Sequence, residues 1–222
     1  MSRFFFLLVS ILILTSQPVR GDIILYNTRA DLNAATVGRT VIDFEGIASD
    51  GGFMFLPTPT GITLSGVNFT IDHTNNNGNL FVIGRDRYYA GNSVLSSQES
   101  TIGRNNLVTS FPGVSTAFAL DFGSFSSTPF IFTLSTGDTF IRPTPGFFDE
   151  PNTTFVGVTS SVPISSLRID LAAAGDVLNI DNFTMGTAVP EPASLVLFVF
   201  GSLGLFGYGW RWRRRKSSVE VV

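Results

Sequence analysis

Residues 118–134 read FALDFGSFSSTPFIFTL, and this stretch decides the fold class. Phe118, Leu120 and Phe122 alternate with smaller or charged residues, and the segment 130–134 repeats the alternation. Successive side chains of a β-strand point to opposite faces, so this period of two predicts antiparallel strands with one face on a core. The Gly, Ser and Pro residues between the two segments predict a connecting loop.

The same pattern of short alternating segments extends over residues 22–186. Alternation also occurs in four further segments, 42–45, 62–71, 167–171 and 178–183. Two of these slip in phase, and we expect a β-bulge at Ser65-Gly66 and another before Phe183. One short helix is expected over Thr28–Ala35, capped by its first residue. About eight to ten strands without an internal repeat predict an all-β fold, a jelly-roll-type antiparallel β-sandwich.

The composition excludes several classes of protein. Hydrophobic residues make up 44% of the chain, with 22 phenylalanines, which is too apolar for a disordered chain. The absence of cysteine excludes a disulfide scaffold and a thiolate site, and the single histidine excludes a multi-histidine metal site. Residues 22–190 carry 7 arginines and no lysine against 15 acidic residues, a net charge of −8. No nucleic-acid partner is therefore expected.

The first 21 residues have the pattern of a secretory signal peptide. Arg3 precedes an apolar run of 11 residues, 4–14, and a more polar segment, 15–21, comes next. As a helix the apolar run is about 17 Å long, too short for a hydrocarbon core of about 30 Å. We expect cleavage near Gly21–Asp22 and export of the domain that begins at Asp22, with an uncleaved anchor as the alternative.

Near the other end, residues 193–210 read ASLVLFVFGSLGLFGYGW, without a charge. A helix of this length is about 27 Å long and crosses a bilayer. Five basic residues follow it: Arg211, Arg213, Arg214, Arg215 and Lys216. Basic residues beside an apolar helix stay on the cytoplasmic side. The pattern predicts one transmembrane helix at 193–210, a cytoplasmic tail at 211–222 and a linker at 187–192 before the span.

The linker contains Pro190, Glu191 and Pro192, and two prolines around one acid do not fit inside a helix. The tripeptide, the apolar span and the basic end, in this order, resemble the PEP-CTERM sorting signal of exported bacterial proteins. The resemblance implies recognition by exosortase, an integral-membrane processing enzyme of Gram-negative bacteria. It further implies an inner-membrane intermediate, cleavage near the motif, and sorting to the cell surface or extracellular matrix.

A second resemblance covers both ends of the domain. The opening YNTRADLNAATVGRTVIDFEG (26–46) and the close DVLNIDNFTMGTAVPEP (176–192) look like the corresponding segments of many PEP-CTERM ectodomains. These segments read as a strand, a short helix and a strand at the start, and as a last strand leading into the motif. The resemblance implies a secreted sandwich similar to lectins or carbohydrate-binding modules.

Paired acids are the first candidates for a site. Asp43 and Glu45 lie on the non-core side of a predicted strand, and Asp181 lies on the predicted last strand. Ca²⁺ takes about six to eight oxygen ligands from carboxylates and carbonyls. One hypothesis is a structural calcium site of Asp43, Glu45 and Asp181, with Asn182, which would resemble those of carbohydrate-binding modules. The alternative is a solvated acidic surface, and no other cofactor is expected.

Arg85, Tyr88 and Tyr89 are candidates for a glycan contact, because aromatic and planar polar groups stack on sugars and hydrogen-bond to them. Their alternative is a surface segment with a local ion pair. No catalytic residue stands out, so we expect a non-enzymatic surface or matrix protein, structural or adhesive in extracellular polysaccharide. One alternative is a carbohydrate-binding module with a specific glycan ligand. Another is a small glycoside hydrolase, which needs two carboxylates about 5–9.5 Å apart.

Overall fold

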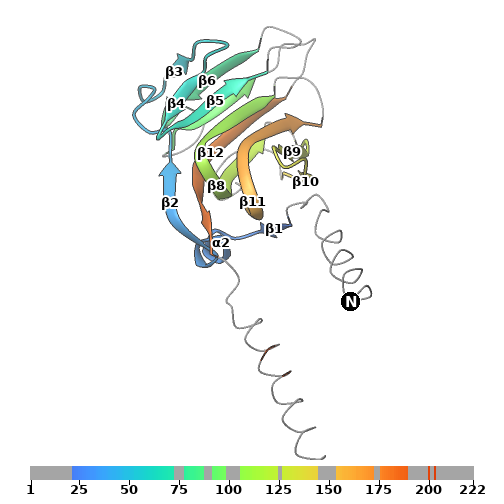
Figure 1. Ribbon diagram of the computed structural model, residues 1–222. Coiled ribbons are helices and arrows are strands. Elements are labelled where there is room, and N and C mark those ends of the chain that lie inside the picture. Colours follow the sequence, from blue (N-terminus) through green and yellow to red (C-terminus); the bar gives the residue numbers. More distant parts are fainter. Residues whose placement is uncertain are drawn as a thin grey trace, which may run out of the picture. The chain divides into compact units, whose positions relative to one another are not determined.

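The computed structural model describes residues 22–72, 78–87, 92–98, 106–124, 127–144, 154–172 and 176–189, together with Phe200 and Leu203. Figure 1 shows a domain of antiparallel strands with one short helix. The elements are β1 (Ile23–Tyr26), α2 (Arg29–Ala34), β2 (Thr36–Ile42), β3 (Phe53–Phe55), β4 (Ile62–Leu64), β5 (Val67–Ile71), β6 (Asn79–Ile83), β7 (Val94–Gln98), β8 (Leu107–Ser124), β9 (Phe130–Leu134), β10 (Thr139–Arg142), β11 (Thr154–Leu171) and β12 (Val177–Ala188). The prediction of an all-β antiparallel fold is confirmed.

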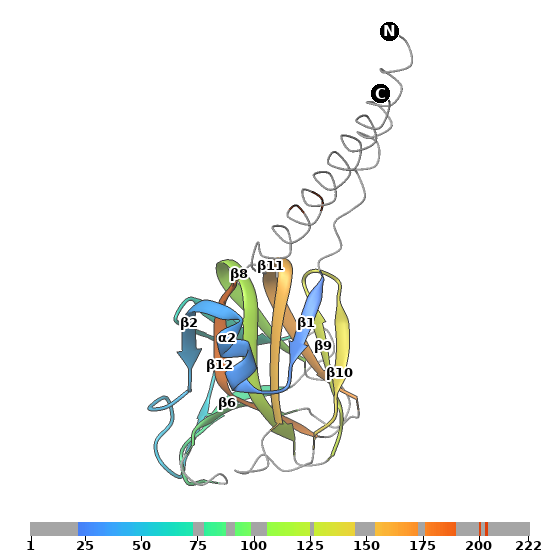
Figure 2. The same ribbon diagram turned by 90° about the horizontal axis from the view of Figure 1, so that it is seen from below.

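Two layers of strands share the long strands β8 and β11. In one layer, the first half of β11 pairs with β1 and with the second half of β8. The second half of β8 also pairs with β12, which pairs in turn with β2 and with β7. β7 pairs with β6, and β6 pairs with β3 at the edge. In the other layer, the second half of β11 lies between β9 and the first half of β8, with β10, β5 and β4 at the edges. Figure 2 shows the strands around the domain interior from below.

Each long strand contains a proline where it passes from one layer to the other. In β8 this is Pro112, followed by Gly113 with a φ of 66°. In β11 it is Pro163, which lies within a register shift between Thr159 and Ile164. Proline has no backbone N–H for the strand ladder, and glycine adopts a positive φ without a steric penalty. These residues bend the strands without ending them.

The core lies between the layers, and phenylalanines are its largest side chains. Phe118, Leu120 and Phe122 are at most 1% exposed, so the alternation in this segment places them in the core as predicted. The ring of Phe69 contacts the rings of Phe44 and Phe183 edge to face, with centroids 5.3 Å and 5.2 Å away. Burial of such a side chain contributes about 1.5–3 kcal/mol. The buried phenylalanines therefore contribute substantially to the stability of a domain without disulfides.

The two predicted irregularities have different outcomes. Ser65 and Gly66 form no bulge: they are the two turn residues of a hairpin between β4 and β5, in which Leu64 pairs with Val67. Both have positive φ values, 47° and 82°, which is typical of a two-residue hairpin turn with the twist of the flanking strands. The irregularity before Phe183 is confirmed, since the β12–β8 register shifts between Asp181 and Thr184.

The helix is also as predicted. α2 follows Thr28, whose Oγ1 accepts the N–H of Asp31 at 3.1 Å and so satisfies one of the helix's unpaired donors. The described residues contain twelve strands rather than eight to ten. Short strands such as β3 and β10 have too few residues to show a period in the sequence.

The domain reaches slightly further than the sequence suggests. β12 continues to Ala188, so it includes the first two residues of the expected linker. The chain divides there into two compact units, Met1–Ala188 and Val189–Val222. Among the described residues, no helix is long and apolar enough to cross a bilayer. The expected signal peptide, the Pro-Glu-Pro motif and the basic tail lie outside the described residues, as does the expected span apart from Phe200 and Leu203.

Candidate functional site: an acidic cluster between β2, β8 and β12

Strand pairing brings the predicted acidic residues into one region. β12 lies between β2 and β8: Phe183 pairs with Ile42 of β2, and Asp181 pairs with Asp121 of β8. Asp43 comes directly after β2 and therefore follows Ile42, the residue that pairs with Phe183. The prediction that Asp43 and Glu45 lie on a strand is wrong, because β2 ends at Ile42 and both residues follow it. Asp121 is an acidic residue that the sequence did not single out.

A bulge at Asn182 organises the centre of this cluster. Asn182 has a φ of 49°, a left-handed conformation that asparagine tolerates better than most residues. Its backbone N–H donates to Asp181 Oδ1 at 2.6 Å. Its side-chain Nδ2 donates to Asp121 Oδ2 at 2.9 Å and to Asp181 Oδ2 at 3.2 Å. One amide group thus bridges two carboxyl groups that would otherwise repel each other.

Arg29, the first residue of α2, supplies the positive charge at this end of the cluster. Its Nη2 lies 2.9 Å from Asp121 Oδ2, and its Nη1 donates to Thr184 Oγ1 at 3.0 Å. Its guanidinium lies over the ring of Phe155, 5.0 Å from the centroid, an arrangement that a cation on an aromatic face favours. Asp121 is therefore neutralised by a positioned arginine, and Asp181 has no arginine among its described partners.

Glu45 is held by a different set of groups. The backbone N–H of Ser93 donates to Glu45 Oε1 at 2.8 Å, and the Ser93 hydroxyl donates to Oε2 at 3.2 Å. Arg85 Nη2 lies 3.3 Å from the same Oε2, with side chains 47% and 31% exposed, so this ion pair contributes little to stability. Asp43 Oδ1 accepts the N–H of Glu45 at 3.2 Å. Both oxygens of Glu45 are thus engaged within the domain.

Asp181 has the most perturbed chemistry of the cluster. It is 3% exposed, and burial raises its pKa to about 7, although the hydrogen bond from the Asn182 N–H acts in the opposite direction. The negative charges of Asp121, Glu45 and Asp43 raise the pKa further. A raised carboxyl pKa next to an ionised carboxylate is also typical of a general acid. Here, however, the carboxyl group with the raised pKa, that of Asp181, is buried, and its neighbour Asp121 is bound to Arg29.

The fit of these residues to a metal ion is limited. Within the parts of the chain that the structure describes, no group of three or more His, Cys, Asp or Glu side chains is placed to hold a metal ion. Asp121 and Asp181 share the amide of Asn182, and Glu45 is bound to Ser93 and Arg85. Asp43, Glu45 and Asp181 do not converge as calcium ligands do, and calcium binding stays a prediction.

The candidate glycan residues are only partly described. Arg85 pairs with Glu45, whereas Tyr88 and Tyr89 lie outside the described residues. Beside this segment the structure shows an apolar surface that the sequence did not indicate: Phe53, Met54 and Phe55 of β3 are 39%, 45% and 66% exposed.

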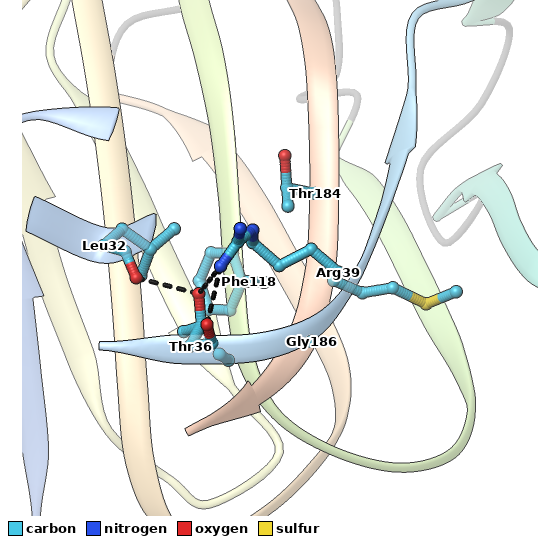
Figure 3. Close-up of a pocket in the computed structure, with 8 residues that line it drawn as sticks. Leu32, Thr36, Arg39, Phe118, Thr184 and Gly186 are labelled. Carbon is cyan, nitrogen blue, oxygen red and sulfur yellow. Dashed lines mark hydrogen bonds between the residues drawn. The ribbon is translucent and has the colours of Figure 1, made fainter. Parts of the chain in front are cut away.

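The hollow in Figure 3 lies elsewhere, between α2, β2 and β12. It is lined by Leu32, Thr36, Arg39, Ala117, Phe118, Thr184, Met185 and Gly186. It has no space large enough for a water molecule. Arg39 crosses it and donates to the backbone oxygens of Asn33 and Thr36, at 2.8 Å and 2.6 Å. Arg39 thus closes the C-terminal end of α2, and we assign the hollow a structural role.

Comparison with known proteins identifies one element of the chain. The PEP-CTERM protein-sorting motif matches residues 188–215. A search of curated proteins found no match.

Solved structures with some likeness include the CBM22-1 xylan-binding domain from Paenibacillus barcinonensis, at 14% identity and a TM-score of 0.33, over 68% of this chain and 95% of that one. Another is a family 11 carbohydrate-binding module of a cellulosomal cellulase from Clostridium thermocellum, at 13% identity and a TM-score of 0.33, over 71% and 99%. A mutant of a family 29 carbohydrate-binding module has 9% identity and a TM-score of 0.31, over 61% and 92%.

Proposed function

We propose that this protein is a non-enzymatic component of the cell surface or extracellular matrix, with a jelly-roll-type sandwich as its exported domain. The sorting motif at 188–215 implies export and a membrane-anchored intermediate, and it is the observation that carries the proposal. Exosortase in the inner membrane of a Gram-negative bacterium would recognise Pro190, Glu191 and Pro192. The released domain would then act structurally or adhesively within extracellular polysaccharide.

The acidic cluster supports a non-catalytic role. Glycoside hydrolysis needs one carboxyl that donates a proton and a second that acts on the sugar, both open to the substrate. Asp181, which has the raised pKa, is buried, and Asp121 and Glu45 are each bound to an arginine. The small hydrolase stays the weaker alternative. Turnover of a polysaccharide that Asp181→Asn or Glu45→Gln abolishes would establish it against our proposal.

Sorting is tested by mass spectrometry of the surface-released protein from a host that produces exosortase. We expect a mature chain without Arg211–Val222. A variant with Pro190, Glu191 and Pro192 replaced by alanine should stay in the membrane fraction. The matched control replaces Pro57, Thr58 and Pro59 by alanine, because it changes two prolines and the residue between them within the domain. A released protein that still carries Arg211–Val222 would contradict the proposal.

The surface of β3 favours glycan binding as a second candidate function. Phe53 and Phe55 lie on one face of the strand, and both rings contact Phe81, with centroids 5.8 Å and 5.6 Å away. Arg87 lies over the ring of Phe53, 4.9 Å from the centroid. Exposed apolar patches rimmed by polar residues often mark ligand sites. Together with the candidate Arg85, these residues offer an apolar platform beside hydrogen-bond donors.

A glycan array with the wild type and Phe55→Ala tests this candidate. Phe55→Ala should lose most of the binding of any glycan that the wild type retains. Ile141→Ala on β10 is the matched control, since Ile141 is 63% exposed on a strand that does not pair with β3. If the wild type retains no glycan, or if Phe55→Ala binds the retained glycan as well as the wild type does, β3 is excluded as the binding platform.

Calcium is the remaining proposal for the acidic cluster. A cation there would relieve the repulsion that Asp121, Glu45 and Asp43 exert on Asp181. Glu45 would have to leave Ser93 and Arg85 to bind it. A ligand that binds only the folded state raises the melting temperature. We therefore expect CaCl₂, but not MgCl₂ at the same concentration, to raise the melting temperature at pH 8. An unchanged melting temperature would remove calcium from the proposal.

A further inference from the structure

The end of β12 is held by both of its neighbours. Thr187 pairs with Val37 and Ala188 pairs with Thr36, both in β2. On the other side, the backbone N–H of Ala188 donates to Thr116 Oγ1 of β8 at 2.7 Å. Figure 1 shows this end of β12 beside β2 and α2. The last residues of the domain are thus part of the sheet and not of a loose linker.

Only Val189 separates this held end from Pro190, the first residue of the sorting tripeptide. One extended residue spans at most about 3.6 Å, so the tripeptide begins within about 7 Å of Ala188. An enzyme that binds the residues before its cleavage site as an added strand needs their backbone hydrogen-bonding groups. Thr187 and Ala188 are already engaged in strand pairing and in the hydrogen bond to Thr116, so an enzyme that bound them as an added strand would compete with the sheet.

We propose that the pairing of Thr187 and Ala188 with β2 and Thr116 limits the rate at which the sorting signal is removed. The enzyme acts on the fraction of molecules in which this end of β12 has opened. Cleavage breaks one peptide bond near the motif, and water supplies the hydroxyl of the new carboxyl end and the hydrogen of the new amino end. This inference rests on the sorting function proposed above.

The local structure allows such opening without unfolding of the domain. The β12–β2 register is irregular between Met185 and Thr187, and β2 pairs with no described strand other than β12. Val37 is 55% exposed, and Gly38 has a φ of 60°. Bulges and exposed hydrogen bonds lower the free energy of local opening. The aromatic core involves Phe183 and earlier residues of β12, which stay in place when only the last two residues open.

Two variants of the full chain test the inference by pulse-chase labelling in a host with exosortase. Thr116→Val removes the acceptor for the Ala188 N–H and keeps the shape of the side chain. One net hydrogen bond changes an opening equilibrium by about fivefold, so the signal should be removed about fivefold faster. Inserting Gly-Ser-Gly-Ser between Ala188 and Val189 gives the enzyme unpaired residues and should accelerate removal at least as much.

Two control variants carry the same kinds of change, a Thr→Val substitution and a four-residue insertion, on β10 and in the turn before it. Thr139→Val replaces a hydroxyl on β10, which pairs only with β9 among the described strands, and the same four residues are inserted between Thr136 and Gly137 in the turn before β10. Both should be processed at the wild-type rate. Equal rates for wild type and insertion after Ala188, or slower removal after that insertion, would overturn the inference and leave the sorting function intact. No removal in any chain would overturn the sorting function and this inference together.

Discussion

Replacing Asp181 by asparagine should remove a pH dependence of the domain's stability. In the folded domain, burial and the charges of Asp121, Glu45 and Asp43 raise the pKa of Asp181 from 3.8 to about 7. Between these values the folded chain keeps a proton on this carboxyl that the unfolded chain releases. A state that holds more protons loses stability as the pH rises, so the free energy of unfolding should fall through this interval.

The size of the effect follows from the same numbers. The shift from 3.8 to about 7 is roughly three pKa units, each equivalent to about 1.36 kcal/mol, or about 4 kcal/mol in all. About two of these units fall between pH 5 and pH 8, so the wild type should lose roughly 3 kcal/mol over that range. Asp181→Asn keeps an acceptor for the Asn182 N–H and loses one for its Nδ2, which costs about 1 kcal/mol. That cost is relative to the protonated carboxyl, and the wild type has already lost a similar amount between its unfolded-state pKa of 3.8 and pH 5. The variant should therefore be about as stable as the wild type at pH 5 and clearly more stable at pH 8.

Urea unfolding followed by circular dichroism at pH 5 and pH 8, in buffer with EDTA, measures this difference. Asp50→Asn is the matched control, because Asp50 is an exposed aspartate in a turn. It should keep the pH dependence of the wild type. The reasoning is refuted if the free energy of unfolding of Asp181→Asn changes as much between the two pH values as that of the wild type.

Further substitutions test the fold by urea unfolding. Phe69→Ala should lower the free energy of unfolding by about 3–5 kcal/mol, because Phe69 is fully buried, whereas exposed Phe55→Ala should change it by less than about 0.5 kcal/mol. Gly61→Ala should destabilise far more than Gly38→Ala: both glycines have positive φ, but only at Gly61 would the new Cβ lie 1.8 Å from the Phe69 carbonyl oxygen. Thr28→Ala should lower the free energy of unfolding by about 1 kcal/mol through loss of the helix cap, and an unchanged value would contradict that role.

Much of the fold could be predicted from the sequence by the alternation of apolar and polar residues. The alternation in 118–122 depends only on local geometry, and Phe118 and Phe122 are buried as it predicts. Thr28 was identified as a cap for the same reason, since its partner Asp31 is three residues away. Features of this kind need no knowledge of which strands are neighbours.

Features that depend on tertiary context were missed. Pro112 and Pro163 are typical of strand ends, yet β8 and β11 continue through them, because each strand finds new partners in the second layer. Ser65-Gly66 was assigned to a bulge because the alternation changes phase there and glycine tolerates the backbone geometry of a bulge. Sequence alternation alone does not distinguish a bulge from a turn when both change the phase.

The candidate site was predicted in part for the same reason. Asp43, Glu45 and Asp181 were chosen as acids on two predicted strands. Asp181 lies on β12, but the neighbouring strand β2 ends at Ile42, and Asp43 and Glu45 follow it. Asp121 and Arg29 were missed because their role depends on the register of β12 against β8 and on the position of α2. In the sequence, Asp121 differs in no way from other acids that alternate with core residues.

The core and the candidate site depend on one residue. If Asn182 were a regular strand residue instead of forming a bulge, strand alternation would turn Phe183 to the same face as Asp181 and away from the core. The bulge places Phe183 against Phe69 and at the same time directs the Asn182 amide to Asp121 and Asp181. A substitution in the acidic cluster therefore acts on the core through the backbone. Loss of binding or sorting in such a variant indicates a functional role only if its free energy of unfolding matches that of a control with equal loss of stability.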